Sequence, residues 1–361
     1  MTNTDRKLYL DGLRGVAAVV VFIGHLLLAL FDAFWIFNGR AAVCVFFVLS
    51  GFVLADLVER STMSLLAQVL RRYLRLVGPM LLSSALAWAL LEVGAYRNVE
   101  AAAVTESRWL ALWYQFEPSF MTMIWETVYG VFVTGASAYN SNLWTMRPEL
   151  IGSVFVFVIG SVARTRAWRG TCYVTLAVWF WSDYLLLFSV GALFYDFQNE
   201  LKRLMHSNII RISAFVAGLF FFIATEKLLK HMYFPPVDMM RWQMLSATLI
   251  VAAVLTWPLL QHSFGGVIGR ALGRISFTLY LIHLPIICSL TSWLVITLPK
   301  SISVATSIAV TTPVVFIASF LLCPLIDQWP TMLSRSAGTS TDNAISSAWD
   351  NLKRRYAAIT E

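Results

Sequence analysis

The stretch Leu10–His25, LDGLRGVAAVVVFIGH, begins the first long apolar run of the chain and carries three ionisable side chains, Asp11, Arg14 and His25. Such groups are costly inside a membrane-spanning helix, so they mark a functional site by default. On an α-helix, Arg14 and His25 lie about 20° apart around the axis and about 16 Å apart along it, and Asp11 falls within about 60° of both. One helix face therefore presents a carboxylate, a guanidinium and an imidazole at successive depths.

Two of these residues, Arg14 and His25, also have an ordinary structural interpretation. Arg14 could anchor the helix at the membrane interface, as basic residues on the cytoplasmic side do. His25 alone could be a hydrogen-bonded core residue. Three polar groups on a face whose other members, such as Gly15 and Ala18, are small or apolar favour a site.

The composition is that of a polytopic membrane protein. Of the 361 residues, 58% are hydrophobic and 13% are charged, whereas soluble domains average about 45–50% apolar and about 25% charged residues. Apolar runs near the length that spans a bilayer recur along the chain, so we expect an all-α bundle of about ten spanning helices. The expected spans are 9–31, 41–58, 74–93, 149–163, 171–182, 184–199, 211–229, 242–260, 275–297 and 303–326.

We expect residues 1–326 to form a single membrane domain and residues 327–361 a short cytoplasmic C-terminal tail. Arginines cluster in the connections near 59–75 and 164–169, whereas 92–118 is mainly acidic. Cytoplasmic connections carry excess Lys and Arg, so the arginine-rich ones should lie inside and both termini with them. This assignment requires that the apolar run 119–135 does not cross the membrane, a point that hydropathy leaves open.

The charges and cysteines exclude two classes of partner. The net charge of +7 comes from Lys and Arg in the connections between spans, so it does not indicate nucleic-acid binding. The four cysteines lie in apolar runs without CxxC or zinc-site spacing, so we expect neither a metal nor a disulfide framework. The expected partners are membrane lipids and an acceptor substrate, and the oligomeric state is open.

Two further motifs lie in the second and third spans. In CVFFVLSGF, Ser50 and Gly51 interrupt an apolar helix; small residues there serve helix packing as readily as they line a site. Arg72 and Arg75 lie one turn apart where the third span begins. They are either positive-inside anchors or an anion clamp, since Arg suits bidentate phosphate recognition.

The segment Asn142-Leu-Trp144-Thr-Met-Arg-Pro148-Glu149 precedes the next span. Pro148 favours a helix start, which places Glu149 in the first helical turn, at the outer boundary of the membrane on the expected topology. An acid is favourable at a helix N-terminus for electrostatic reasons alone. The functional alternative is a carboxylate that orients or deprotonates an acceptor hydroxyl.

The fourth motif, GRISFTLYLIH, places Ser276, Tyr280 and His283 at positions i, i+4 and i+7. These side chains share one helix face. His283 could be a satisfied core residue, but a hydroxyl, a phenol and an imidazole in line within a spanning helix favour the lining of a cavity.

Together, the RX10H helix, FFVLSGF, LWTMRPE and GRISFTLYLIH resemble the motifs of the acyltransferase 3 family of integral membrane acyltransferases. The resemblance covers about residues 8–326. Trp144 and Glu149 keep the family's W-x4-E spacing, Tyr280 and His283 keep its Y-x-x-H element, and Phe277 stands where the family commonly has Tyr. The resemblance implies a multi-pass enzyme, expected in a bacterial plasma membrane. Such enzymes move acyl groups, usually acetyl from acetyl-CoA, onto hydroxyls of carbohydrates or other exported or lipid-linked acceptors.

On this resemblance we expect His25, Glu149 and Arg14 to be catalytic. Arg14, Arg72 and Arg75 would bind the phosphates of the acyl-CoA donor on the cytoplasmic side, while Glu149 would meet the acceptor from the outer side. Asp11, Ser50, Asn142, Trp144, Ser276, Tyr280 and His283 would line the substrate cavity. Imidazole titrates near neutral pH, so His25 suits the general base. A covalent acyl-His or acyl-Ser intermediate is an open alternative.

A different class of function is also consistent with these residues. A solute transporter or proton-coupled exporter could use Asp11, Arg14, His25 and Glu149 as a proton relay. A membrane scaffold without chemistry is disfavoured by so many polar groups within the spans. Binding of acyl-CoA by the purified protein discriminates the enzyme from both.

Overall fold

The computed structural model describes residues 8–33, 36–224, 226–232 and 238–360, and within them the chain is helical with no strand. The first half contains α1 (Leu8–Phe31), α2 (Gly39–Arg60), α3 (Leu65–Glu92), α4 (Asn98–Thr105), η2 (Leu110–Leu112), α5 (Phe120–Trp125), η3 (Glu126–Gly130), α6 (Val131–Thr134), η4 (Ser141–Thr145), α7 (Met146–Val162) and α8 (Arg166–Trp179). The second half contains α9 (Leu185–Asp196), α10 (Gln198–Leu204), α11 (Asn208–Ile223), α12 (Glu226–His231), α13 (Met239–Thr256), α14 (Pro258–Gly265), α15 (Val267–Ile286), η5 (Ile287–Thr291), α16 (Ser292–Thr297), α17 (Lys300–Cys323), η6 (Pro324–Gln328) and α18 (Trp329–Thr360).

Fewer helices than expected are long enough to span a membrane. All ten expected spans are helical in part or in full. Among the described residues, seven helices are long and apolar enough to cross a membrane, or eight if α10 and α11, which meet at 99°, form one broken span. α8 and α9 have 14 and 12 residues, whereas a straight span needs about 20. Ten crossings are therefore not confirmed.

Glycines hold α1 and α15 together over a long interface. A methyl group at Gly15 would lie 2.5 Å from the backbone nitrogen of Gly273, and one at Gly273 would lie 2.5 Å from the carbonyl oxygen of Asp11. A methyl group at Gly12 would lie 3.3 Å from Cα of Gly269 in α15 and 2.0 Å from the carbonyl oxygen of Phe264 in the preceding helix, α14. These separations leave no room for a side chain, so the two backbones are in direct contact. We call this contact the α1–α15 glycine seam.

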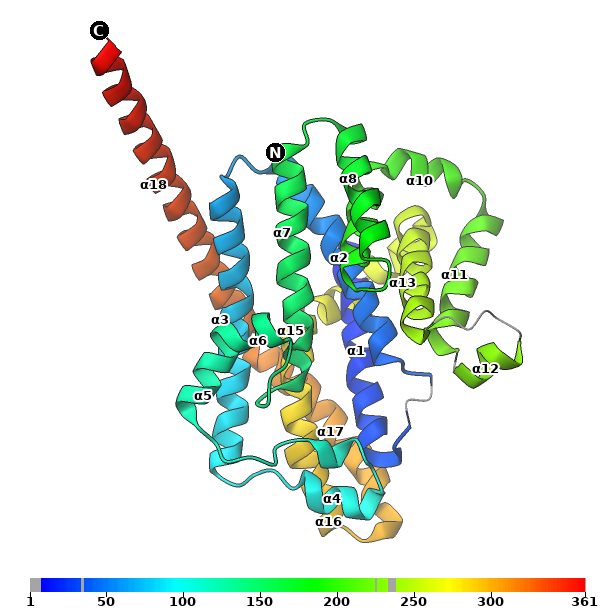
Figure 1. The fold of residues 1–361 in the computed structure, drawn as a ribbon. Coiled ribbons are helices and arrows are strands. Elements are labelled where there is room, and N and C mark those ends of the chain that lie inside the picture. Colours follow the sequence, from blue (N-terminus) through cyan, green and yellow to red (C-terminus); the bar gives the residue numbers. More distant parts are fainter. Residues whose placement is uncertain (1–7, 34–35, 225, 233–237, 361) are drawn as a thin grey trace.

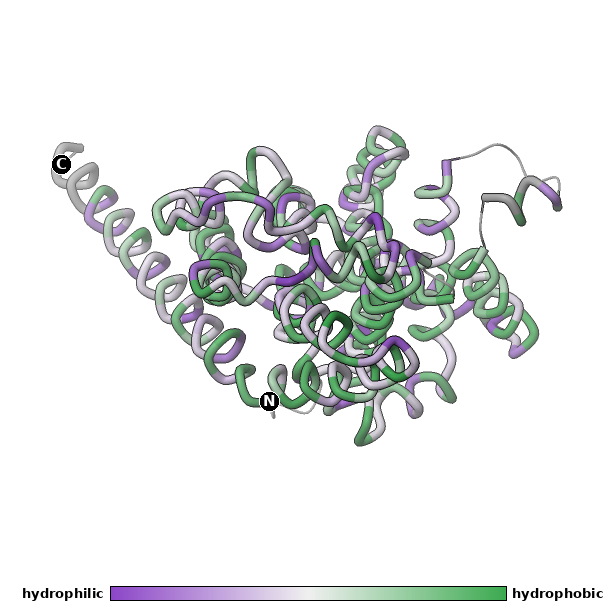
Figure 2. The backbone as a smooth tube through the Cα atoms, turned by 90° about the horizontal axis from the view of Figure 1, so that it is seen from below, coloured by the Kyte–Doolittle hydropathy of each residue, from purple (hydrophilic) through white to green (hydrophobic). Residues whose placement is uncertain are grey.

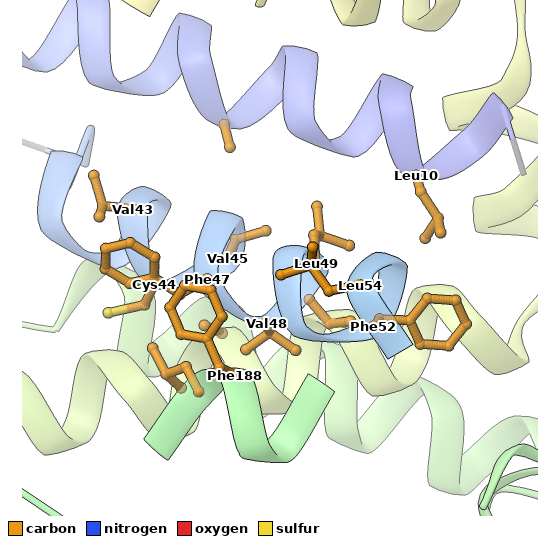
Figure 3. Packing of buried hydrophobic residues seen from close by; sticks show 14 of the residues in the cluster. Leu10, Val43, Cys44, Val45, Phe47, Val48, Leu49, Phe52, Leu54 and Phe188 are labelled. Atoms are coloured by element: carbon orange, nitrogen blue, oxygen red, sulfur yellow. The ribbon is translucent and has the colours of Figure 1, made fainter. Parts of the chain in front are cut away.

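α2 is the central helix of the bundle and packs against α1, α7, α9 and α13. Figure 3 shows its apolar side chains between α1 and α9, with the ring of Phe47 beside that of Phe188, 5.4 Å between centroids. A methyl group at Gly51 would lie 2.1 Å from the carbonyl oxygen of Phe188. Gly51 therefore serves close helix packing, one of the two alternatives for this motif, and α9 is buried against protein despite its short length.

The arginine-rich connections meet at one end of the bundle. Figure 1 places the end of α2, the start of α3, the end of α7 and the start of α8 at the upper end, with α4 and α16 at the lower end. Residues Phe120–Thr134 form a shorter apolar segment beside α3. In Figure 1, α3 descends to the α4 end and α7 returns to the opposite end; that this segment does not cross the membrane stays a prediction. That the upper end and both termini are cytoplasmic stays a prediction.

The first part of the C-terminal segment packs against the bundle. α17 continues through η6 into α18, which runs antiparallel along the first half of α3. A methyl group at Gly78 would lie 2.6 Å from Cβ of Pro330, and the backbone N–H of Ser64 donates a 2.8 Å hydrogen bond to Asp342. Beyond that contact α18 projects from the bundle, and its residues alternate between hydrophilic and hydrophobic (Figures 1 and 2). The boundary expected at residue 326 therefore falls within a continuous helical segment.

Candidate functional site

Two histidines from distant parts of the chain meet inside the bundle. Nδ1 of His25 on α1 lies 2.9 Å from Nε2 of His283 on α15. The two rings have centroids 5.1 Å apart and planes inclined by 22°. His283 is fully buried, whereas His25 is partly exposed. The glycine seam joins the same two helices, so the backbone contact sets the separation of the imidazoles.

The hydrogen bonds of His283 determine which nitrogen of each ring carries the proton. Nδ1 of His283 lies 2.9 Å from the carbonyl oxygen of Leu279. A carbonyl oxygen only accepts, so this Nδ1 carries the proton and Nε2 of the neutral ring is an acceptor. Nδ1 of His25 then donates to it, which leaves Nε2 of His25 without a proton. No hydrogen-bond partner for that atom lies among the residues described, so His25 presents a free lone pair.

Aromatic rings enclose the histidine pair. Trp109, from the connection between α4 and η2, stacks on His25 with ring centroids 5.0 Å apart and planes inclined by 21°. The ring of Phe22 meets that of His283 edge to face at 6.2 Å. Trp109 was not among the residues expected from the sequence, because a tryptophan in a loop carries no signal of which helix it covers.

Glu149 lies inside the bundle, in contact with Arg72 and Ser50. Its Oε1 accepts a 2.6 Å hydrogen bond from the Ser50 hydroxyl and a second bond from Nη2 of Arg72. Nε of Arg72 donates to the Ser153 hydroxyl over 2.9 Å. The side chains of Arg72 and Glu149 are 19% and 12% exposed, so this ion pair is largely shielded from solvent. Glu149 thus lies among α2, α3 and α7 at the start of α7, and its expected contact with the acceptor stays a prediction.

The three arginines expected to form an anion clamp do converge, but each has an acidic partner. Arg14 pairs with Asp11 at 3.3 Å, Arg75 pairs with Asp327 at 2.6 Å, and Arg72 pairs with Glu149. Arg72 is also close enough to Arg75 and Arg14 to be repelled by their charges. Asp327, which closes this cluster, lies at the end of the last span and was assigned to the tail from the sequence. The three guanidinium groups thus lie close together, but their positive charges are largely neutralised by the paired carboxylates.

The LWTMRPE segment is attached to α15 through reciprocal hydrogen bonds. The amide of Asn142 donates to the carbonyl oxygen of Tyr280 over 3.1 Å, and the Tyr280 hydroxyl donates to the carbonyl oxygen of Asn142 over 2.9 Å. The hydroxyls of Thr145 and Tyr280 are 3.1 Å apart. Trp144 packs beside Tyr184 with 5.3 Å between ring centroids. These bonds hold η4, and with it Glu149, at its depth in the bundle.

Ser276, Tyr280 and His283 share a face of α15, but their side chains make different contacts. The hydroxyl of Ser276 donates to the carbonyl oxygen of Gly273 in its own helix over 2.9 Å, and that of Tyr280 is bonded to η4. Of these three side chains, His283 is the one that is hydrogen-bonded to a titratable side chain, His25, among the described residues. The ring of Tyr280 is 6.1 Å from that of His283, so the phenol lies between the Glu149 network and the histidine pair.

A small pocket opens beside the arginine cluster, where α2, α3, α7 and α18 meet. Its volume is about 150 Å³. Its lining residues include four arginines, polar residues and apolar residues: Arg71, Arg72, Arg75, Arg335, Gln68, Ser61, Ser334, Thr331, Met63, Leu54, Leu57 and Phe157. Within the described residues, no group of three His, Cys, Asp or Glu side chains could hold a metal ion, and the cysteines are unpaired.

These features define an all-helical, multi-pass membrane protein with paired imidazoles and a guanidinium cluster within the bundle. A family model described as an acyltransferase domain, that of acyltransferase 3, matches residues 7–327. The chain therefore belongs to the acyltransferase 3 family and is a membrane acyltransferase. No curated protein and no solved structure matches it.

Proposed function

We propose that the chain is an O-acyltransferase that moves an acyl group, expected to be acetyl, from acyl-CoA to a hydroxyl of a carbohydrate or another exported or lipid-linked acceptor. The observation that carries this proposal is the His25–His283 hydrogen bond, which leaves Nε2 of a partly exposed His25 free to accept a proton. Acyl transfer to an alcohol needs such a base beside the attacking hydroxyl.

In the proposed reaction, Nε2 of His25 accepts the hydroxyl proton while the hydroxyl oxygen attacks the thioester carbonyl carbon. The C–O bond forms, the C–S bond breaks, and the imidazolium returns its proton to the departing sulfur. The products are an ester and the free thiol of CoA. The bond from Nδ1 of His25 to His283 holds the ring in one tautomer and orientation, as a partner on the second ring nitrogen does in other histidine bases.

The arginine-rich end is the proposed entry of the donor. Arg is suited to bidentate contacts with phosphate, and Arg14 lies about 16 Å along α1 from His25. The extended pantetheine arm of CoA would cover that length and bring the thioester to His25. Because Arg14, Arg72 and Arg75 each have an acidic partner, they would bind phosphate only together with other cations or by exchanging partners.

We assign Glu149 and Ser50 a positioning role. Glu149 accepts bonds from both Ser50 and Arg72, which fixes the guanidinium relative to α2 and α7. The Glu149 carboxylate is thus bonded to both a guanidinium and a hydroxyl. These bonds support a role in orienting the arginines that bind the donor, in preference to a role in contacting the acceptor. The proposed setting is a bacterial plasma membrane with the donor on the cytoplasmic side.

Single-turnover transfer from pre-bound, radiolabelled acetyl-CoA tests the proposal with the full chain in lipid nanodiscs. Membrane glycan extract serves as the acceptor. His25→Gln should slow transfer by about 10²–10⁴, the usual contribution of a general base, while binding of acetyl-CoA is retained. His206→Gln is the matched control, since His206 is exposed. A wild-type protein that binds no acetyl-CoA would contradict the proposal and favour the transporter, and undiminished transfer by His25→Gln would remove His25 as the base.

A further inference from the structure

Two of the arginine side chains that line the pocket beside the arginine cluster are not paired with a carboxylate among the described residues. Arg71 and Arg335 both line it, and their charges repel each other across it. Among the described residues, neither has a carboxylate within ion-pair distance. The nearest polar contact of Arg71 is the sulfur of Met63 at 3.7 Å from Nη1. Arg72 and Arg75, in contrast, have acidic partners on the inner side of the pocket.

Packing against α3 fixes the backbone of α18 on both sides of Arg335, whose side chain is exposed. A methyl group at Gly338 would lie 3.0 Å from Cβ of Arg71, so α18 rests directly on the aliphatic part of that side chain. Asp342 and Pro330 attach the same helix to α3 on either side. Arg335 is therefore held beside the pocket although α18 lies beyond residues 7–327, which the family model matches.

Two like charges brought together without an acidic partner cost free energy in the unliganded protein, and a bound anion removes that cost. Ser334 and Thr331 line the same pocket, but their hydroxyls donate to the carbonyl oxygens of Thr331 and Asp327, so the guanidinium groups are the donors open to a phosphate. The volume of about 150 Å³ is smaller than the roughly 300–1,000 Å³ of sites that enclose drug-sized ligands. The pocket thus suits phosphate groups with the rest of the ligand outside.

We propose that α18 completes a phosphate-binding site in which Arg71 and Arg335 contact the phosphates of the acyl-CoA donor, with Arg72 and Arg75 behind them. This inference rests on the proposed function, since it takes acyl-CoA as the donor. It makes Arg335 a determinant of donor binding supplied by the C-terminal helix, outside the matched family domain. The headgroup of an anionic lipid offers similar chemistry and is distinguished by the test.

The test measures binding by calorimetry with the full chain in nanodiscs of phosphatidylcholine. The probes are acetyl-CoA, which carries phosphates, and S-acetyl-pantetheine, which has none. Arg335→Ala should weaken acetyl-CoA binding roughly tenfold to hundredfold, as expected for loss of charge-assisted hydrogen bonds, and should leave S-acetyl-pantetheine unaffected. Arg335→Lys should lose less. The matched control is Lys353→Ala, which removes a charge farther along α18 and away from the pocket.

The outcomes separate this inference from the proposed function. Wild-type affinity for acetyl-CoA in Arg335→Ala, or an equal loss with both probes, overturns the role of Arg335 while acetyl-CoA binding by the wild type preserves the function. Absence of acetyl-CoA binding in the wild type overturns both. Retention of phosphatidylglycerol by the wild type but not by Arg335→Ala in native mass spectrometry, with acetyl-CoA binding unchanged, assigns the pocket to lipid. Equal thermal unfolding of all variants in detergent confirms that each is folded.

Discussion

His25 donates a hydrogen bond from Nδ1 to Nε2 of His283 over 2.9 Å, although 258 residues separate the two along the chain. Because His283 is itself bonded to the carbonyl oxygen of Leu279, the proton on each ring has a defined position. The pair therefore acts as one unit, in which His283 orients and His25 presents the basic atom.

The first prediction concerns His283. His283→Leu should slow transfer by about 10–100-fold, because Nδ1 of His25 loses its acceptor and the ring can rotate or change tautomer. His283→Gln should recover part of the rate, since its amide oxygen can accept the same bond. The measurement is single-turnover transfer, compared with binding of acetyl-CoA, which both variants should retain. Equal rates for Leu and Gln at this position would show that the hydrogen bond does not orient His25.

The second prediction concerns the ion pair of Arg72 and Glu149. Glu149→Gln leaves a largely shielded guanidinium without its counter-charge, so the free energy of unfolding should fall by roughly 1–3 kcal/mol. The control is Asp56→Asn, which breaks the exposed pair of Asp56 with Arg60, whose side chain is 59% exposed; exposed pairs contribute about 0–1 kcal/mol. Chemical unfolding in detergent measures both. Equal stabilities of the two variants would mean that the Arg72–Glu149 pair has no more than the effect of a surface contact.

The third prediction concerns the glycine seam. Gly15→Ala should destabilise the protein by about 1–3 kcal/mol or more, because the methyl group would meet the backbone of α15. Gly265→Ala, where the nearest atom to an added methyl lies 3.8 Å away, should leave stability almost unchanged. Thermal unfolding compares the two. A change in stability at Gly15 as small as that at Gly265 would show that the two helices separate at this contact without a cost in stability.

The fourth prediction concerns topology. With the four native cysteines replaced, a single cysteine at Ala167, beside the arginines that start α8, should resist an impermeant thiol reagent in intact cells. A cysteine at Ala103 in α4 should react. Both positions are exposed, so accessibility within the protein does not confound the comparison. Labelling of position 167 from outside would reverse the assignment of the arginine-rich end to the cytoplasm.

The family and the local arrangement of α1 could be predicted from the sequence, because both depend on residues close together in the chain. Asp11, Arg14 and His25 share a face once α1 is helical from Leu8 to Phe31. The position of Pro148 likewise indicated the start of α7, which begins at Met146. The spacing of residues along the chain is enough to predict which side chains share a helix face, and no information on the packing of other helices is needed.

The partners of these residues could not be predicted, because they depend on how distant helices pack. The pattern at Ser276, Tyr280 and His283 defines a face but not the elements that face it, so the reach of His283 to His25 was missed. Glu149 was placed at the membrane boundary because hydropathy does not reveal that η4 enters the bundle. The mixed charge of residues 327–361 indicated a tail, whereas Pro330 and Gly338 fit closely against α3.

The glycine seam also restricts changes in the length of the chain. It fixes α1 against α15 at Gly15, ten residues before His25. A single residue inserted between them would turn the imidazole by about 100° and advance it by about 1.5 Å, which would carry it away from His283. Substitutions on the outward side of α1 leave this alignment intact, but insertions and deletions in that interval break it. The contact at Gly15 therefore requires a constant number of residues between Arg14 and His25 in the RX10H motif.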